Sequence, residues 1–446
     1  MINFSFIIIY ILCAPFLDGT ELYTLLTIHF LFLVIKTVRT TQNAISPIFV
    51  YYLGVIIVNI ANIYLISLLN SGMQLKTYGY IIPKYINEAA FIWCISNTMF
   101  SIGYKAFSTK SFPKINIELY SMKVYYIIFG CLIMLNIVYI LGDAYYVRGN
   151  QISKLTVLFN TIGILFFARI WGKYNNFKFM LFAITLFILE TYLSLLYSFL
   201  RFELILPTFY LFTGYFIGKG HYKYLLSYRI LPFIAIIFIY SNVFYMLGGY
   251  RTHFISVFTN SQQTDQEIPV DVSNPSSSLL TRSANVAQIT NVIKLVDKNN
   301  GPYWGRASAP ILTALIPRFL WPDKPIIQLG AWFALEAGLA NKNEEGYVNN
   351  SVNMTVCGEL YLDFGWFGVF IGSFLFGGLV SALWNCTQFY SSEFNLTGTI
   401  FGGYLIMLSI GSYADLQIAV TLLSTYLLFL LTKNIFLFFS KKKGTR

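Results

Sequence analysis

Charged residues are scarce in this chain, and so are histidine and cysteine. Asp, Glu, Lys and Arg make up only 11% of the 446 residues, beside three histidines and five cysteines. So little charge is atypical of a water-soluble globular protein, and the sequence excludes that class. The cysteines have no metal-site spacing, so we predict neither a disulfide framework nor a metal site, and we expect no cofactor.

Apolar residues take the place of the missing charge. They make up 57% of the chain and form long runs over almost its whole length. Because backbone in lipid must satisfy its own hydrogen bonds, each long run predicts a helix. The chain is therefore predicted to be an all-α polytopic membrane protein with about twelve transmembrane helices. The predicted spans are 3–17, 22–36, 47–69, 88–104, 124–142, 155–171, 179–199, 203–218, 230–248, 363–386, 397–413 and 417–438.

The basic residues predict the orientation of these spans. With the N-terminus in the cytoplasm, most lysines and arginines, Arg169 and Lys433 among them, fall in cytoplasmic loops or at cytoplasmic helix ends. This distribution follows the positive-inside rule and puts both termini in the cytoplasm. The N-terminus has no basic leader and no small-residue cleavage site, so the first span is expected to remain as an anchor. The net charge of +11 then belongs to the cytoplasmic face and argues against nucleic-acid binding.

One long outer segment separates the ninth and tenth spans. A loop of this length is usually functional or disordered. Residues 260–278 have the composition of a flexible linker, whereas apolar residues recur at helical spacing from Ser277 to Lys298, with Asn300-Gly301 as a stop signal. The second pattern predicts an amphipathic helix along the outer membrane surface. The chain thus divides into an N-terminal bundle of about nine spans (1–248), a large periplasmic loop (249–362) and a C-terminal part of about three spans with a basic tail (363–446).

Cations in this loop form a candidate binding site. The stretch "IPRFLWPDKP" (316–325) has three prolines that stiffen the backbone around Arg318 and Lys324. Stiffening lowers the entropy lost on binding, which suits a fixed cationic clamp, although an interfacial elbow with Trp321 among lipid headgroups has the same composition. Arg282 lies on the predicted amphipathic helix, where it would bind an anionic substrate group or reach lipid phosphate.

Further polar residues lie at the outer ends of predicted spans. They would bind substrate or only pair with one another. They are Arg201 and Glu203 between the seventh and eighth spans, Arg251 and His253 after the ninth, Arg306 in the loop, and Glu359 and Asp363 before the tenth.

Two ionisable residues fall inside predicted spans, Glu190 in the seventh and His29 in the second. A charged side chain at such a depth costs about 2.5 to 3.5 kcal/mol by insertion scales, so each needs a partner or a role. For Glu190 a structural contact, a proton path and support for Arg201 all stay open. For His29 we expect a structural hydrogen bond.

Four motifs in the last half of the chain resemble a known family. "YRTHF" (250–254), "LLTRSAN" (279–285), "IPRFLWPDKP" and "GELYLDFGWFGV" (358–369) follow one another in this order. The order is similar to that in Wzy-type oligosaccharide repeat-unit polymerases, the O-antigen and enterobacterial-common-antigen polymerase group. The likeness covers about residues 249–375, and elsewhere it is one of topology only.

The resemblance implies an enzyme of the bacterial inner membrane with a periplasmic active site, similar in fold to metal-independent, lipid-dependent glycosyltransferases. It would transfer a growing glycan from undecaprenyl pyrophosphate to a lipid-linked repeat unit, for O-antigen, capsule or exopolysaccharide synthesis. By the same resemblance, Arg251, Arg282 and Arg318 would serve substrate binding and catalysis. Membrane lipids, a chain-length-regulating co-polymerase and a flippase would be its partners.

The chemistry of that reaction suits these residues. Breaking the bond between the anomeric carbon and phosphate leaves charge on the pyrophosphate, which guanidinium groups hold by paired, charge-assisted hydrogen bonds. The acceptor hydroxyl also needs a base, for which His253 and Glu359 are preferred over Asp363 and Glu203. The predicted catalytic residues are therefore Arg251, His253, Arg318 and Glu359, and the predicted substrate-binding residues are Arg201, Arg282, Arg306, Lys324 and Asp363.

Three other functions stay open at this point. An O-antigen ligase would use the same donor with a different acceptor. A flippase or other transporter for lipid-linked oligosaccharides typically has internal repeats and charged residues near the membrane midplane. In this chain the two halves differ, and most charged residues on the outer side lie at the ends of the predicted spans or in the long outer loop. A cysteine transpeptidase would have to use Cys357, the only cysteine in an outer loop, and no Arg/His set surrounds it in sequence.

Overall fold

The computed structural model describes residues 2–40, 46–71, 81–114, 122–143, 151–193, 201–220, 284–309, 321, 329–342, 348, 351–389, 396–410 and 417–441. Within these ranges the chain is helical and has no strand; a single isolated bridge joins Lys342 and Val348. The prediction of an all-α protein is confirmed for this part of the chain. The predicted linker (260–278) lies outside it.

Every predicted span except 230–248, which is outside the described residues, coincides with a helix. The helices are α1 (Ile2–Cys13), α2 (Gly19–Thr40), α3 (Pro47–Asn70), α4 (Ile86–Ala106), α5 (Met122–Asp143), α6 (Gln151–Tyr174), α7 (Phe177–Leu193), α8 (Arg201–Gly218), α11 (Val286–Lys298), α13 (Leu329–Glu336), α14 (Thr355–Phe367), α15 (Ser373–Thr387), α16 (Leu396–Ile410) and α17 (Gln417–Lys441), with a 3-10 turn η1 (Pro83–Tyr85) before α4 and a π-helical turn η5 (Gly368–Gly372) between α14 and α15.

The apolar helices indicate a membrane protein. In the described ranges, three helical segments are long and apolar enough to cross a membrane: Gly19–Val38, Pro47–Asn70 and the joined segment Thr355–Thr387. Large apolar side chains such as Ile57 and Leu375 are exposed on these segments, as lipid-facing residues are. The twelve-span count, the cytoplasmic termini and the periplasmic loop stay predictions.

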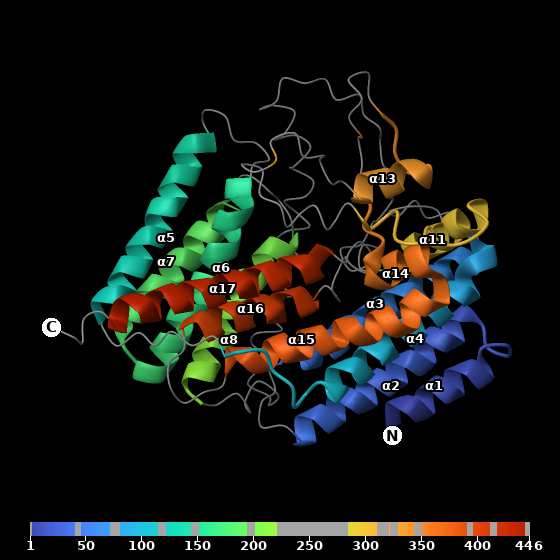
Figure 1. The fold of residues 1–446 in the computed structure, drawn as a ribbon, viewed down its shortest axis with the longest axis horizontal. Helices are drawn as coiled ribbons and strands as arrows, with labels where there is room; N and C mark the ends of the chain where they lie inside the picture. The colour runs from blue at the N-terminus through green and yellow to red at the C-terminus, as the bar shows by residue number, and fades with distance from the viewer. Residues whose placement is uncertain are drawn as a thin grey trace.

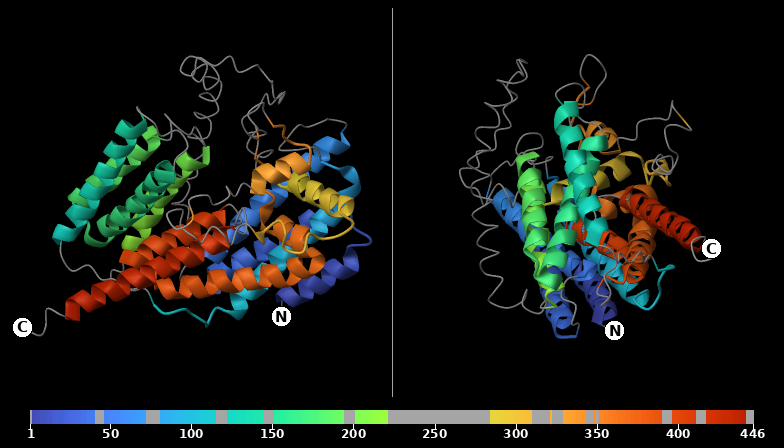
Figure 2. Two further views of the ribbon diagram at one scale, coloured as in Figure 1. Left: turned by 45° about the horizontal axis from the view of Figure 1, so that its top comes forward. Right: turned by 90° about the vertical axis from the view of Figure 1, so that its left-hand side faces the viewer.

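The helices form two groups (Figures 1 and 2). In one, α6 packs against α5, α7 and α8; in the other, α4 packs against α1, α2, α11 and α15. Helix α16 contacts α3, α15 and α6 and so joins the groups. Each group has its own cluster of buried apolar side chains.

Two glycines bring α4 and α15 unusually close. A Cβ atom built on Gly103 would lie 1.9 Å from the backbone oxygen of Phe374, and one on Gly377 would lie 2.1 Å from that of Phe100. Each helix backbone therefore fills the space that a side chain on the other would need. Such small-residue contacts are the usual means of close helix packing in membranes.

The tenth predicted span is interrupted by a kink and begins earlier than predicted. Helix α14 starts at Thr355, within the predicted outer loop, and Gly365 breaks it with φ 57° and ψ −145°. The chain then continues through η5 into α15. A Cβ atom on Gly365 would lie 3.1 Å from the side chain of Pro302, so the kink is also a point of contact with the loop after α11.

The polar residues inside the helices make structural contacts. His29 lies 2.9 Å from the Tyr10 hydroxyl through Nδ1 and is stacked on Phe6, which confirms the predicted hydrogen bond. Glu190 accepts a hydrogen bond of 3.0 Å from Asn160, which also forms a reciprocal amide pair with Asn136. These bonds join α5, α6 and α7; a proton path through Glu190 stays a prediction.

Arg169 differs from the sequence-based expectation. It does not extend from a helix end, because its residue is only 6% exposed and its Nη1 donates to the Thr399 hydroxyl at 2.6 Å. Its guanidinium also lies over the ring of Phe389, 5.3 Å from the centroid. This cation therefore connects α6 with α16 and the residues that follow α15.

Candidate functional site

The candidate site lies where α11, the loop after it and the start of α14 meet one end of α3 and α4 (Figure 1). Helix α11 has the predicted amphipathic pattern, and Val286, Ile289, Ile293 and Val296 are all buried. They pack in one core with residues of α4 and α14. The prediction of a helix lying on the membrane surface is therefore corrected: the apolar face of α11 is covered by protein.

The start of α11 is fixed by Asn62 of α3. Its Oδ1 accepts hydrogen bonds from the backbone N–H groups of Asn285 (2.9 Å) and Val286 (3.0 Å), and its Nδ2 donates to Asn285 Oδ1 at 2.9 Å. These bonds satisfy N–H groups that a helix start leaves without partners. The helix accordingly begins at Val286 and not at Ser277 as predicted.

The predicted stop at Asn300-Gly301 is confirmed. Asn300 is in the left-handed region with φ 54°. Its N–H donates to the Asp297 carbonyl at 3.0 Å, and that of Gly301 donates to the Val296 carbonyl at 2.9 Å. This pair of bonds is a Schellman motif, which ends the helix and starts the loop.

Replacing Asn62 with leucine is expected to loosen α11. The two buried N–H groups would lose their acceptor, at a cost of roughly 2 to 4 kcal/mol in total, since each unsatisfied donor costs about 1 to 3 kcal/mol. Hydrogen–deuterium exchange of residues 286–298 should then rise well above that of the wild type. The control is Asn70→Leu at the exposed end of α3. Unchanged exchange in Asn62→Leu would contradict the capping role.

Two tyrosines tie α11 and α14 to the start of α4. The Tyr85 hydroxyl donates to Asp297 Oδ2 of α11 at 2.5 Å, and the Tyr361 hydroxyl of α14 donates to Glu88 Oε1 at 2.6 Å. The bond to Asp297 also raises the pKa of Tyr85, because only the neutral phenol donates it. Tyr85 therefore remains a neutral donor at physiological pH.

The loop of residues 301–309 is bound to the last turn of α14 before the kink. The N–H groups of Tyr303 and Trp304 donate to the carbonyls of Leu362 (2.9 Å) and Asp363 (2.6 Å). The Asp363 carboxylate then accepts one backbone N–H on each oxygen, from Ala307 at 3.1 Å and Ser308 at 2.8 Å. Four hydrogen bonds thus fix the loop, and Asp363 is fully buried beneath it.

Of the predicted site residues, the structure brings Arg306, Glu359 and Asp363 together. Arg306 is an exposed residue of the loop that Asp363 holds. Glu359 lies one turn earlier on α14 and is 3% exposed. The Asp363 carboxylate accepts hydrogen bonds from the loop backbone directly after Arg306. Direct contact of Asp363 with substrate stays a prediction.

The other predicted residues are not placed. Arg201 is the first residue of α8, and its side chain, like that of Glu203, is outside the description. In the stretch 316–325 only Trp321 is described, and it is exposed. Arg251, His253, Arg282, Arg318 and Lys324 lie outside the described residues, so their part in the site stays a prediction.

Sequence reasoning missed Asn62, Glu88, Asp297 and Trp304. For Asn62 there was a signal, since an amide in an apolar run needs a hydrogen-bond partner. For Glu88 and Asp297 there was none, because acids at helix ends are ordinary solvated residues in most proteins. For Trp304 there was none either, because a tryptophan near a predicted membrane surface is ordinary.

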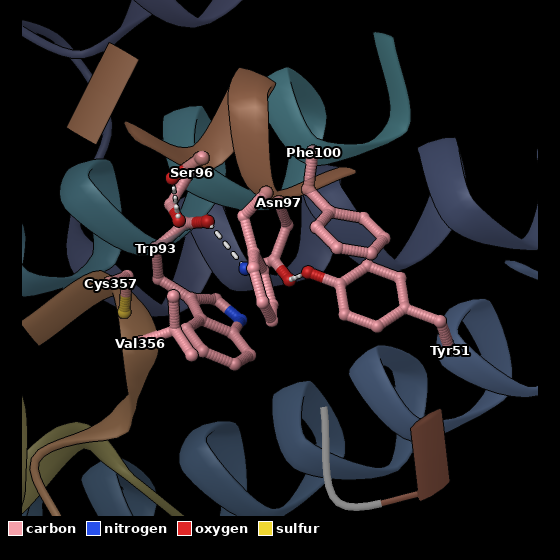
Figure 3. Close-up of a pocket in the computed structure, with 9 residues that line it drawn as sticks. Tyr51, Trp93, Ser96, Asn97, Phe100, Val356 and Cys357 are labelled. Atoms are coloured by element: carbon pink, nitrogen blue, oxygen red, sulfur yellow. Dashed lines mark hydrogen bonds between the residues drawn. The ribbon is translucent and has the colours of Figure 1, made fainter. Parts of the chain in front are cut away.

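A small cavity lies below this region, between α3, α4, α14 and α15 (Figure 3). Asn97 is bonded on both sides, accepting from the Tyr51 hydroxyl and donating to the Trp93 carbonyl, each at 2.6 Å, and the Ser96 and Ser373 hydroxyls lie 2.8 Å apart. Cys357 also lines the cavity but is buried, with its thiol against the Thr355 hydroxyl. Buried thiols are typically inert, which argues against the transpeptidase alternative.

Comparisons of the chain with protein-family models, curated proteins and solved structures found no match. The likeness to repeat-unit polymerases therefore rests on the four motifs themselves. Among the described residues, no three or more His, Cys, Asp or Glu side chains gather as they would around a metal ion.

Proposed function

We propose that the protein polymerises lipid-linked oligosaccharide repeat units at the periplasmic face of the bacterial inner membrane. The bond between the anomeric carbon of the donor glycan and undecaprenyl pyrophosphate breaks, and the pyrophosphate leaves with the electron pair. A bond forms between that carbon and a hydroxyl oxygen of the acceptor repeat unit, whose proton passes to a base. The product is a glycan longer by one repeat on the acceptor lipid.

The contact between α14 and the loop of residues 301–309 is the observation that carries the proposal. The motif "GELYLDFGWFGV" supplies Asp363, which binds the backbone of this loop. In the sequence, "LLTRSAN" ends at Asn285, just before α11, and "IPRFLWPDKP" follows the loop. One motif thus binds the segment that lies between two others in the chain, which supports a shared site.

The arginines would act on the leaving group. Arg318, Arg251 and Arg282 would hold the pyrophosphate by paired hydrogen bonds and neutralise the charge that develops on it, with Arg201, Arg306 and Lys324 binding substrate around them. Glu359 and His253 are the candidate bases for the acceptor hydroxyl. Glu359 is nearly buried on α14, one turn before Asp363.

The test uses purified protein in detergent with a lipid-linked single repeat extracted from producing cells. The wild type should form a ladder of longer glycans on gels. Arg318→Lys keeps the charge but loses the two-pronged hydrogen bond, so its rate should fall about tenfold or more. Arg148→Lys, in a predicted short outer loop far from the motifs in sequence, is the matched control and should retain the wild-type rate. Glycans of normal length made by Arg318→Lys would show that Arg318 does not belong to the cationic clamp.

The same preparation separates the alternatives. A ligase would pass finished glycan to a different acceptor and leave single repeats unextended. A flippase would move unchanged substrate across a vesicle membrane. A co-polymerase that regulates chain length would change the ladder's length distribution without being needed for its formation.

A further inference from the structure

Trp304 combines an exposed side chain with a backbone conformation that is unusual for its residue type. Its residue is 72% exposed, and its φ of 54° lies in the left-handed region, which bulky side chains rarely adopt. Gly305 follows with φ 82°. A bulky residue keeps such a conformation only where its surroundings impose it, and strained residues of this kind cluster at active sites and ligand clamps.

The surroundings of Trp304 do impose it. Its own N–H and that of Tyr303 are bonded to the end of α14, and the two N–H groups after Arg306 are bonded to the Asp363 carboxylate. The Tyr303 ring meets Trp332 of α13 edge to face, with centroids 5.7 Å apart. Trp304 is therefore an exposed indole on a fixed backbone, and Arg306, also exposed, lies two residues away.

We propose that Trp304 is a stacking platform for a sugar ring of the lipid-linked glycan. This inference rests on the proposed function and adds a substrate-binding residue to it. The electron-rich face of an indole attracts the polarised C–H groups on the flat face of a pyranose. Arg306 donates hydrogen bonds to hydroxyl or acidic groups at the edge of the same sugar.

A fixed backbone favours a glycan over lipid as the partner. Tryptophans that anchor proteins among lipid headgroups act by partitioning of the ring, which any local backbone conformation allows. A rigid platform, in contrast, lowers the entropy lost when one specific ligand is bound. The four hydrogen bonds and the left-handed residue of this loop serve the second purpose.

The experiment compares Trp304→Ala and Trp304→Phe with the wild type and with Phe177→Ala. Phe177 is a matched control because it is an exposed aromatic residue (68%) at the start of α7, outside the four motifs. We expect Trp304→Ala to raise KM for the lipid-linked single repeat about tenfold with kcat within twofold, as expected for loss of one aromatic contact. Trp304→Phe should restore most of the affinity, and Phe177→Ala should leave KM unchanged.

Tryptophan fluorescence gives a second readout that needs no turnover. Glycan released from the same lipid by mild acid should shield wild-type protein, but not Trp304→Phe, from quenching by acrylamide. Unchanged KM and unchanged shielding in Trp304→Ala would overturn the inference. Quenching of the Trp304 fluorescence by brominated phospholipid, both with and without glycan, would also overturn the inference, because it would show that Trp304 lies in the lipid as a membrane anchor. A wild type that forms no ladder would overturn the proposed function, and the shielding would still decide the role of Trp304.

Discussion

Asp363→Asn is expected to lower the rate of polymerisation about 100-fold while the helical bundle stays folded. Both carboxylate oxygens accept backbone N–H groups, from Ala307 and Ser308, in a fully buried place. Asparagine keeps one acceptor and turns an NH₂ group toward the other N–H, so one buried donor loses its partner at a cost of about 1 to 3 kcal/mol. The loop that carries Trp304 and Arg306 would shift, and misplacement by about 1 Å is enough for a 100-fold loss of rate.

Two measurements separate this effect from general unfolding. Hydrogen–deuterium exchange should rise in residues 301–309 and stay unchanged in α4 and α15, and the rate of ladder formation should fall in parallel. Glu336→Gln is the control, because the ion pair of Glu336 with Lys298 at 3.9 Å is exposed and worth about 0 to 1 kcal/mol. A normal rate in Asp363→Asn with unchanged exchange of the loop would remove Asp363 from this role.

Local patterns in the sequence predicted the helices well, and the reason is physical. In lipid the backbone must form its own hydrogen bonds, so a long apolar run has few alternatives to a helix. The end of α11 was predictable for a similar reason, since Asn300-Gly301 is a local stop signal that the Schellman bonds use. Neither prediction depends on what the helix packs against.

Predictions that depend on packing partners were less successful. The stripe of Val286, Ile289, Ile293 and Val296 indicates that one face of α11 is buried, but a periodic pattern cannot distinguish lipid from protein, and here α14 and α4 cover it. Arg169 was assigned to a helix end by its charge alone. Its partner Thr399 is on another helix, far away in sequence.

In the candidate site, too, the sequence identified some residues, whereas the contacts that they make depend on distant partners. Glu359 and Asp363 were identified because they lie within the motif "GELYLDFGWFGV", where the cation-rich outer loop meets the tenth predicted span. That Asp363 binds the backbone of residues 307 and 308 could not be predicted, because backbone N–H groups are the same in every residue and leave no mark in the sequence. Trp304 was missed because its left-handed φ depends on those same distant bonds.

Gly377→Ala is expected to lower the free energy of unfolding of the whole bundle by about 3 kcal/mol. The new Cβ would lie 2.1 Å from the Phe100 oxygen, far inside contact distance. The obstacle is the backbone of α4 and not a flexible side chain, so the two helices must move apart. Overpacking usually costs about 1 to 3 kcal/mol, and this site belongs at the upper end because α4 also supports α1, α2 and α11.

The control for this change is Gly130→Ala on α5, where nothing lies within 4 Å of the added Cβ. There the substitution should be neutral or stabilise the protein by up to about 1 kcal/mol, because alanine favours a helix over glycine. Thermal unfolding in detergent, followed by size-exclusion retention, measures both. Gly103→Ala adds a methyl group that would meet the Phe374 backbone in the same helix contact. Helices already moved apart by one methyl group accommodate the second more easily, so Gly103→Ala and Gly377→Ala together should cost less than the sum of the two. Equal midpoints for Gly377→Ala and the wild type would show that α4 and α15 do not pack through these glycines.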